Sequence, residues 1–223
     1  WGDEHRAQPL VVSITQSTEL GTNYTPEEVR AIANTAHAQG MHLHLDGSRI
    51  ANAAASLDVP LRAFTTDAGV DVLSLGGTKN GALGAEAIVV LHTEASEGLR
   101  YLRKLNMQLG SKQRFASAQL IALFEGELWR ESAAHANSMA TRLRAALVDA
   151  TATGRLTFTQ QTQSNAVFAR LPFAAAETLR ARFGFYDWAG PFADGTVEVR
   201  WMCSWDTTTA DVDAFAEAIT AAL

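Results

Sequence analysis

The sequence has few of the residues and patterns that several protein classes require. Its one cysteine, Cys203, cannot form an internal disulfide, which fits a reducing compartment such as the cytoplasm. No basic run is longer than two residues and the formal net charge is -6, so we expect no nucleic-acid partner. No apolar stretch approaches the roughly 18 residues of a membrane span, so we expect no membrane partner either.

Patterns that bind metals or supply reactive thiols are also scarce. His42 and His44 stand two positions apart on one expected strand, but no third ligand lies near them in the sequence. Cys203 lies in a strand-like run, where a small buried side chain is a more ordinary interpretation than a catalytic thiol. We therefore expect no metal site.

Lysine is scarce as well. Only Lys79, Lys104 and Lys112 occur, so fifteen of the 18 basic residues are arginine (18 minus 3). A mechanism that needs an amine nucleophile therefore has only three positions at which to place it.

What the sequence does contain is the pattern of an α/β protein. Strands are expected at residues 10–15, 41–45, 70–75 and 87–91, and helices at 25–40, at 50–57 and from residue 60. Thr25 and Glu28 match a capping box, Pro26 suits the first helical turn, and Gly40 ends that helix. Strands separated by helices indicate a mostly parallel sheet with helices on both faces.

The pattern changes after about residue 95. Two long helical stretches are expected near 95–108 and 114–149, followed by strands near 165–170 and 196–203 and helices near 174–183 and 209–222. We expect residues 1–110 to be the C-terminal part of a large α/β domain, and 111–223 to form a connecting helix and a small α+β domain. Because the first section offers so few strands, we expect an N-terminal portion that precedes this sequence.

Charged residues follow two of the expected strands, where parallel sheets bind their ligands. Asp46 follows the strand at 41–45, and Lys79 lies in a glycine-rich loop after the strand at 70–75. If these strands are neighbours, both side chains face one pocket. A partly desolvated lysine can form an imine, and an aspartate can keep the ring nitrogen of pyridoxal 5'-phosphate (PLP) protonated.

Each of these residues also has a plainer interpretation. Lys79 could be a solvated loop lysine, and Asp46 with the glycine after it could form a simple turn. Arg49 could serve only as the ion-pair partner of Asp46. The joint placement at successive strand ends favours the functional interpretation over these alternatives.

Several segments resemble the threonine aldolase and β-eliminating lyase family of fold-type I PLP-dependent enzymes. His-Leu-Asp-Gly-Ser-Arg at residues 44–49 is similar to the family's His-x-Asp-Gly-Ala-Arg segment. Residues 74–81 resemble its strand-to-lysine loop, and residues 18–28 resemble the segment before its preceding helix. Looser similarity continues at residues 110–114 and at 199–200. The resemblance runs over nearly the whole chain.

The resemblance implies a role for each matching residue. Lys79 would form the Schiff base with PLP, and Asp46 would keep the pyridine nitrogen protonated. Thr78 stands where the family commonly has serine, and the hydroxyl is kept. Lys112 and Arg114 would lie near the cofactor phosphate, often that of a neighbouring subunit. The family's phosphate loop and ring-stacking histidine are expected upstream of this sequence.

Two arginines would bind the substrate carboxylate, namely Arg49 and Arg200. Alternation along the strand puts Arg200 on the same face as Glu198, so a solvent-facing Glu–Arg pair is the plainer alternative for this position.

The function implied by the resemblance is retro-aldol cleavage of a threonine-like β-hydroxy-α-amino acid to glycine and an aldehyde. Such a carbon–carbon lyase would be a homodimer or homotetramer in the cytoplasm. A β-eliminating lyase or an aminotransferase on the same fold is the nearest alternative. A non-catalytic α/β module for binding or assembly is the alternative of a different class.

Overall fold

The computed structural model describes residues 2–92 and 98–223. The chain forms two compact units. The first comprises the residues up to Thr18 together with Tyr24–Trp129, and the second comprises Glu19–Asn23 together with Arg130–Leu223. The predicted boundary between the large α/β domain (1–110) and the C-terminal part (111–223) stays a prediction.

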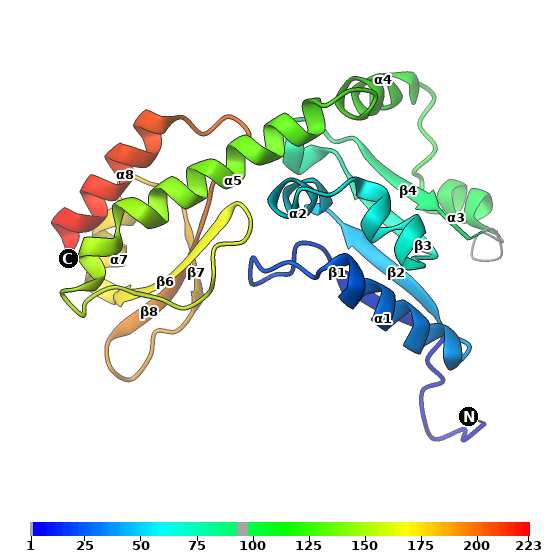
Figure 1. Cartoon of the computed structure of the whole chain (residues 1–223), viewed down its shortest axis with the longest axis horizontal. Helices are drawn as coiled ribbons and strands as arrows, with labels where there is room; N and C mark the ends of the chain where they lie inside the picture. The colour runs from blue at the N-terminus through cyan, green and yellow to red at the C-terminus, as the bar shows by residue number, and fades with distance from the viewer. Residues whose placement is uncertain (1, 93–97) are drawn as a thin grey trace. The chain divides into compact units, whose positions relative to one another are not determined.

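The first unit contains a four-stranded sheet in the order β1-β2-β3-β4. Its strands are β1 (Val11–Thr15), β2 (His42–Gly47), β3 (Val72–Gly76) and β4 (Glu86–Val90). β1 and β3 both run parallel to β2, whereas β4 runs antiparallel to β3. The four expected strands therefore form, but the sheet is mixed (Figure 1).

The helices of the first unit are α1 (Pro26–Ala38), α2 (Ile50–Leu57), α3 (Leu99–Leu105) and α4 (Arg114–Phe124), with short 3-10 turns η1 (Leu61–Phe64), η2 (Thr66–Ala68) and η3 (Thr78–Asn80). Among these helices, α1 begins at a side-chain cap, whereas the N-cap residues of α2, α3 and α4 make no side-chain cap hydrogen bond. The capping box of α1 is present: Thr25 Oγ1 accepts from the Glu28 amide at 3.2 Å, and Glu28 Oε2 accepts from the Thr25 amide at 2.7 Å. The helix expected from residue 60 is replaced by η1 and η2.

Alternation along β2 separates the core from a polar face. Leu43 and Leu45 are fully buried, as are Val29 and Ala33 of α1, and both α1 and α2 contact β2. The intervening residues at positions 42, 44 and 46 are half-buried. These three side chains therefore occupy the opposite face of the sheet.

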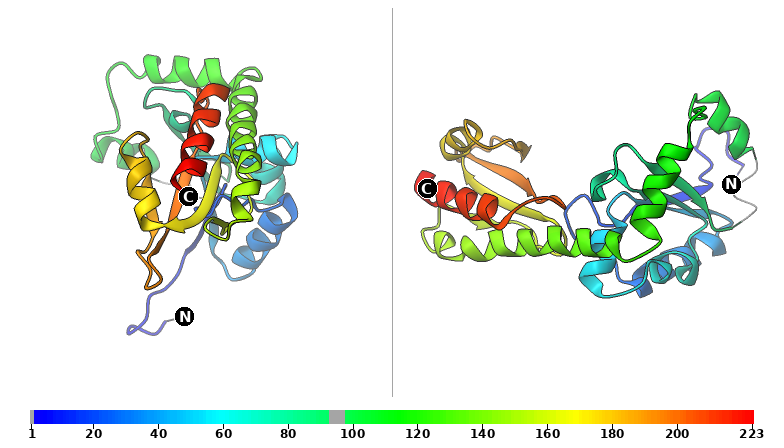
Figure 2. Two further views of the ribbon diagram at one scale, coloured as in Figure 1. Left: turned by 90° about the vertical axis from the view of Figure 1, so that its left-hand side faces the viewer. Right: turned by 90° about the horizontal axis from the view of Figure 1, so that it is seen from above.

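The second unit is built on an antiparallel sheet in the order β5-β6-β8-β7. Its strands are β5 (Thr157–Phe158), β6 (Ala166–Pro172), β7 (Tyr186–Ala189) and β8 (Thr196–Met202), and its helices are α5 (Leu128–Ala146, which begins just before this unit), α6 (Val148–Thr151), α7 (Phe173–Arg180) and α8 (Thr209–Ala222). Leu143 of α5, Val199 of β8 and Ile219 of α8 share one buried cluster. Helices α5 and α8 lie side by side, joined by a two-bonded Arg142–Asp213 ion pair (Figure 2).

The long helices expected in the middle of the chain are shorter in the structure. The stretch at 114–149 is divided into α4, α5 and α6, with Gly126 lying between the first two. The stretch at 95–108 forms α3, and its expected start at 95–97 lies outside the described residues. Strands β5 and β7 were not expected. Within residues 2–92 and 98–223, no helix has the length and apolar character needed to cross a membrane.

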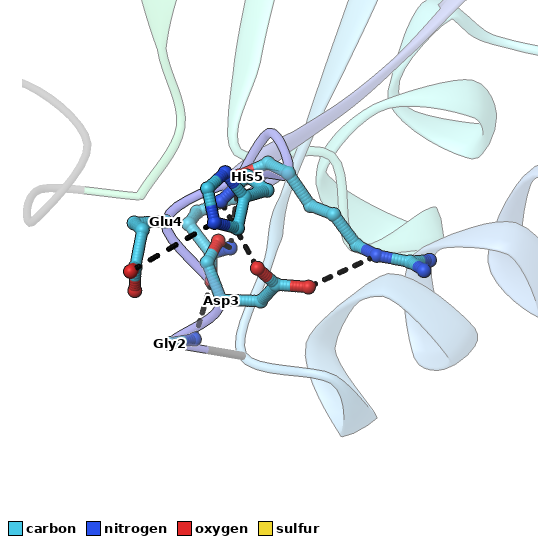
Figure 3. A network of polar contacts seen from close by, with 6 residues as sticks. Gly2, Asp3, Glu4 and His5 are labelled. Atoms are coloured by element: carbon cyan, nitrogen blue, oxygen red, sulfur yellow. Dashed lines mark hydrogen bonds and ion pairs between the residues drawn. The ribbon is translucent and has the colours of Figure 1, made fainter.

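The residues before β1 form a small polar network on the surface (Figure 3). Asp3 pairs with Arg6 at 3.1 Å and accepts from the His5 amide at 3.0 Å, while the Gly2 amide donates to Gln8 at 2.8 Å. All these residues are exposed, so the network contributes little to stability.

Candidate functional site

Two charged side chains lie at the carboxyl ends of neighbouring parallel strands, Asp46 within the end of β2 and Lys79 in the turn after β3. In the register of β2 and β3, Asp46 lies opposite Ser74 and Gly47 lies opposite Leu75. Lys79 follows in the η3 turn, four residues after Leu75. The expectation that these strands are neighbours is confirmed, and the charge of Lys79 acts on the Asp46 carboxylate.

The Asp46 carboxylate is held in its ionised form. Partial burial opposes ionisation, but two hydrogen bonds from Ser48 outweigh it, and the charges of Lys79 and His44 act in the same direction. The pKa of Asp46 therefore lies below its usual value of 3.8. Both hydrogen bonds reach Oδ1, from the Ser48 amide at 2.9 Å and the Ser48 hydroxyl at 2.6 Å. The site thus offers a fixed negative charge.

The turn that carries Lys79 is fastened on both sides of the lysine. The Thr78 amide donates to Glu86 Oε1 at 3.2 Å, and the buried Asn80 side chain donates to the Trp129 carbonyl at 2.8 Å. Thr78 and Lys79 themselves are exposed. The amine and the hydroxyl are therefore presented to solvent by a turn whose backbone is fixed.

Glycine is required at the entry to this turn because other backbone lies very close. A Cβ at Gly76 would lie 2.8 Å from the Ser48 Cα, and a Cβ at Gly77 would lie 2.6 Å from the Ala85 carbonyl oxygen. The Gly77 amide also donates to that carbonyl at 3.0 Å. At Gly76 and Gly77, the entry to the Lys79 turn is therefore packed backbone against backbone.

His44 links three strands on the same face as Asp46. Its Nδ1 lies 2.8 Å from the Ser13 hydroxyl on β1, and its Nε2 lies 2.9 Å from the Ser74 hydroxyl on β3. Both ring nitrogens are thus occupied by hydroxyl groups. Among the residues that the structure describes, no group of three or more His, Cys, Asp or Glu side chains could hold a metal ion.

The first unit contains three further predicted site residues, Arg49, Lys112 and Arg114, and each lies at or near the start of a helix. Arg49 is the N-cap residue of α2, three positions after Asp46. Lys112 and Arg114 are exposed at the start of α4, and the Arg114 guanidinium lies 4.7 Å from the centre of the Phe115 ring.

Arg200 belongs to the second unit, and its surroundings differ from the plain alternative. Instead of pairing with Glu198, it donates through Nη1 to Glu19 Oε2 at 3.2 Å, and its guanidinium lies 4.5 Å from the centre of the Trp188 ring. Glu198 accepts a hydrogen bond from Thr159. Sequence reasoning missed Glu19 and Trp188, because no local pattern links them to Arg200.

Comparison with known proteins places the chain in a family. The family model described as beta-eliminating lyase matches residues 2–172. The chain belongs to the beta-eliminating lyase family. It is 42% identical over 206 residues to the low specificity L-threonine aldolase of Pseudomonas aeruginosa, covering 92% of this chain and 57% of that protein. The enzyme of the same name from Pseudomonas sp. strain NCIMB 10558 is 40% identical over 222 residues, which cover 99% of this chain and 62% of that protein.

The fold has a close counterpart in the solved structure of a threonine aldolase. Leishmania major threonine aldolase matches with a TM-score of 0.89 and 30% identity, over 98% of this chain and 63% of that one. The expected fold class, that of fold-type I PLP-dependent enzymes, is confirmed. The chain spans about 57–63% of the length of these relatives.

The residues of the site fit PLP. An exposed primary amine, an ionised carboxylate and a hydroxyl come from Lys79, Asp46 and Thr78. These are the groups that bind an aldehyde, a protonated pyridine nitrogen and a phosphate. At Gly76 and Gly77, the close backbone contacts leave no room for a larger side chain.

Proposed function

We propose that the full-length protein is a PLP-dependent aldolase that cleaves a β-hydroxy-α-amino acid of the threonine type to glycine and an aldehyde. The observation that carries this proposal is the placement of Asp46 and the Lys79 turn at adjacent strand ends. Support for the substrate class comes from relatives at 40–42% identity, whose names give L-threonine as the substrate. The single cysteine supports a cytoplasmic location.

Each residue near the two strand ends has one task in this proposal. Lys79 is the amine that binds the cofactor covalently, and Thr78 offers its hydroxyl to the phosphate. The ionised Asp46 holds a proton at the pyridine nitrogen. The bound cofactor supplies an electron sink for the pair released when the Cα–Cβ bond breaks. Ser48 keeps the Asp46 carboxylate oriented through two hydrogen bonds.

Two arginines bind the substrate carboxylate in this proposal. A guanidinium presents several N–H donors in one plane and matches a carboxylate with two parallel hydrogen bonds. Arg49 lies three residues after Asp46, and Arg200 lies on the polar face of β8. Their task is to orient the amino acid so that the Cα–Cβ bond, and not another bond at Cα, is broken.

Lys112 and Arg114 complete the proposal with an assembly. Both are exposed and positively charged, Arg114 at the first position of α4 and Lys112 two residues before it, where the helix dipole favours an anion. We propose that they bind the cofactor phosphate of a neighbouring copy, so that the enzyme is at least a homodimer.

The test uses the full-length protein with PLP. Borohydride reduction followed by peptide mapping should label Lys79, and neither Lys104 nor Lys112. Threonine should yield glycine and acetaldehyde in equal amounts. Asp46→Asn should lower kcat by about 100-fold or more, as expected from lost stabilisation of developing charge. The matched control, Asp58→Asn at the end of α2, should leave kcat unchanged.

Four outcomes would contradict the proposal. Label on Lys104 or Lys112 refutes the role of Lys79. Ammonia and a 2-oxo acid without glycine indicate β-elimination, and a new amino acid formed from an added 2-oxo acid indicates transamination. Absence of any cofactor absorbance in the full-length protein favours a non-catalytic module.

A further inference from the structure

Arg200 is held by two side chains to which no role has been given so far. Its side chain is 27% exposed and lies on the face of β8 opposite the buried Val199 and Trp201. Trp188 on β7 provides an aromatic surface 4.5 Å from the guanidinium, and Glu19 provides a carboxylate at 3.2 Å. The guanidinium is therefore already in contact with a ring and an anion.

Trp188 is a fixed contact. The Phe168 ring meets it edge to face, with ring centres 5.4 Å apart and an angle of 89° between the planes. Phe168 is itself buried in β6. A cation over an aromatic face gains stabilisation that grows as water is removed. The Trp188 ring can therefore limit the orientations of the Arg200 side chain.

The backbone that carries Glu19 is also fixed within the second unit. The Gly21 carbonyl accepts from the Ser164 hydroxyl at 3.2 Å, and Asn23 forms hydrogen bonds of 2.7 and 2.9 Å with Gln163. A Cβ at Gly21 would lie 3.2 Å from the Phe168 ring, so this segment is packed tightly. Glu19 thus stands beside Arg200 although 181 positions separate them in the sequence.

The contact with Glu19 is of a kind that another carboxylate can displace. The Glu19 side chain is 62% exposed, and exposed ion pairs stabilise weakly. Its hydrogen bond uses one N–H of a guanidinium that has five. A free amino acid that forms two parallel hydrogen bonds binds such a group more favourably.

We propose that Trp188 is a positioning residue for Arg200, and that the Glu19 carboxylate competes with the substrate carboxylate for the guanidinium. This inference rests on the proposed function, in which Arg200 binds the substrate. When the pair with Glu19 is formed, the Nη1 donor of Arg200 is occupied, and the apparent affinity for the substrate falls with the fraction of protein in which this donor is available. Trp188 acts in the opposite direction, because it keeps the guanidinium in the orientation that a carboxylate requires.

The experiment measures glycine binding by calorimetry and threonine cleavage kinetics on the full-length holoenzyme. Glu19→Gln should lower the Kd for glycine and the KM for threonine by roughly two- to fivefold, the range expected for a weak exposed pair. Trp188→Leu should raise both by roughly three- to tenfold, and Trp188→Phe should restore most of the affinity. kcat should change little, because these residues affect binding before and during the reaction equally.

Two further variants separate the possible failures. Glu198→Gln is the matched control, since Glu198 lies on the same face of β8 but contacts Thr159, and it should alter neither constant. If Arg200→Lys weakens glycine binding while neither Glu19→Gln nor Trp188→Leu alters it, the inference is overturned and the proposed function stands. If Arg200→Lys has no effect, or the wild-type holoenzyme binds no glycine, the carboxylate-binding role of Arg200 is refuted and the inference with it.

Discussion

The strongest structural prediction concerns Asp71, a buried carboxylate at the amino-terminal edge of the first sheet. Its side chain is 5% exposed, and Oδ2 accepts from the Leu43 amide at 2.7 Å and lies 2.8 Å from His37 Nε2. His42 Nδ1 and His92 Nδ1 lie 3.6 and 3.8 Å from Oδ1. Asp71 therefore ties the start of β3 to β2, to the last turn of α1 and to the end of β4.

Asp71→Asn keeps the shape of the side chain but removes its charge. A hydrogen bond to a charged group contributes about 1.5–3 kcal/mol, against about 0.5–1.5 kcal/mol for a neutral pair. With two close hydrogen bonds weakened, the variant should lose about 2–3 kcal/mol of stability at neutral pH. The control is Asp67→Asn, because Asp67 is an exposed residue paired with Arg62 and its loss should have little effect.

The direction of the Asp71 pKa shift determines how the stability contributed by this carboxylate changes with pH. Burial opposes ionisation of Asp71, but the bonds from Leu43 and His37 and the charges of His37 and His42 outweigh it, so its pKa lies below 3.8. The stabilisation is therefore fully present above the unfolded-state pKa and is lost as the pH falls through the lower folded-state pKa.

The assay is hydrogen exchange of the Leu43 amide in the full-length protein, with urea unfolding as the global measure. The difference between wild type and Asp71→Asn should be large at about pH 5 and should shrink at about pH 3. Equal losses for Asp71→Asn and Asp67→Asn, or a difference that does not depend on pH, would refute the reasoning.

Two further predictions concern packing. Gly77→Ala should destabilise the protein by about 1–3 kcal/mol, because the new Cβ would lie 2.6 Å from the Ala85 carbonyl oxygen. The control is Gly126→Ala, where nothing lies within 4 Å of the new Cβ, so its free energy of unfolding in urea should not fall. Equal losses for the two variants would contradict the argument. Burial raises the pKa of Cys203 to about 11, so at pH 8 iodoacetamide should label the folded protein roughly 100-fold more slowly than the unfolded protein, and equal rates would show that the thiol is accessible.

Local signals in the sequence were sufficient for most elements. The capping box at Thr25 and Glu28 fixed the start of α1, and alternation along β8 separated Val199 from Arg200. The antiparallel direction of β4 could also have been predicted, because only residues 77–85 connect it to β3. A parallel strand needs a crossover of roughly a dozen residues or more. β7 gave no usable signal, because it is short and two of its four residues are exposed.

In the candidate site, too, some features have a local signal in the sequence and others do not. The placement of Asp46 and Lys79 at adjacent strand ends was predictable because each lies at or just after the end of its own strand, and neighbouring strands in sequence are often neighbours in a sheet. The contacts of Arg200 with Glu19 and Trp188 depend on how β7 and the segment around Gly21 pack on the second sheet. Such contacts follow from tertiary packing, which no periodicity in the sequence encodes.

Asp46 and Asp71 show that the end of the strand at which an aspartate lies, and not its pKa, distinguishes a functional role from a structural one. Asp46 and Asp71 both have a lowered pKa, so the shift alone does not distinguish them. Asp71 precedes β3 and is covered by the histidines around it, at the edge where parallel strands begin. Asp46 is near the end of β2, half-buried, where the chain turns into α2 and the Lys79 turn follows the next strand. Ligands bind at the carboxyl edge of such sheets. Asp71 is therefore assigned to stability and Asp46 to the proposed chemistry.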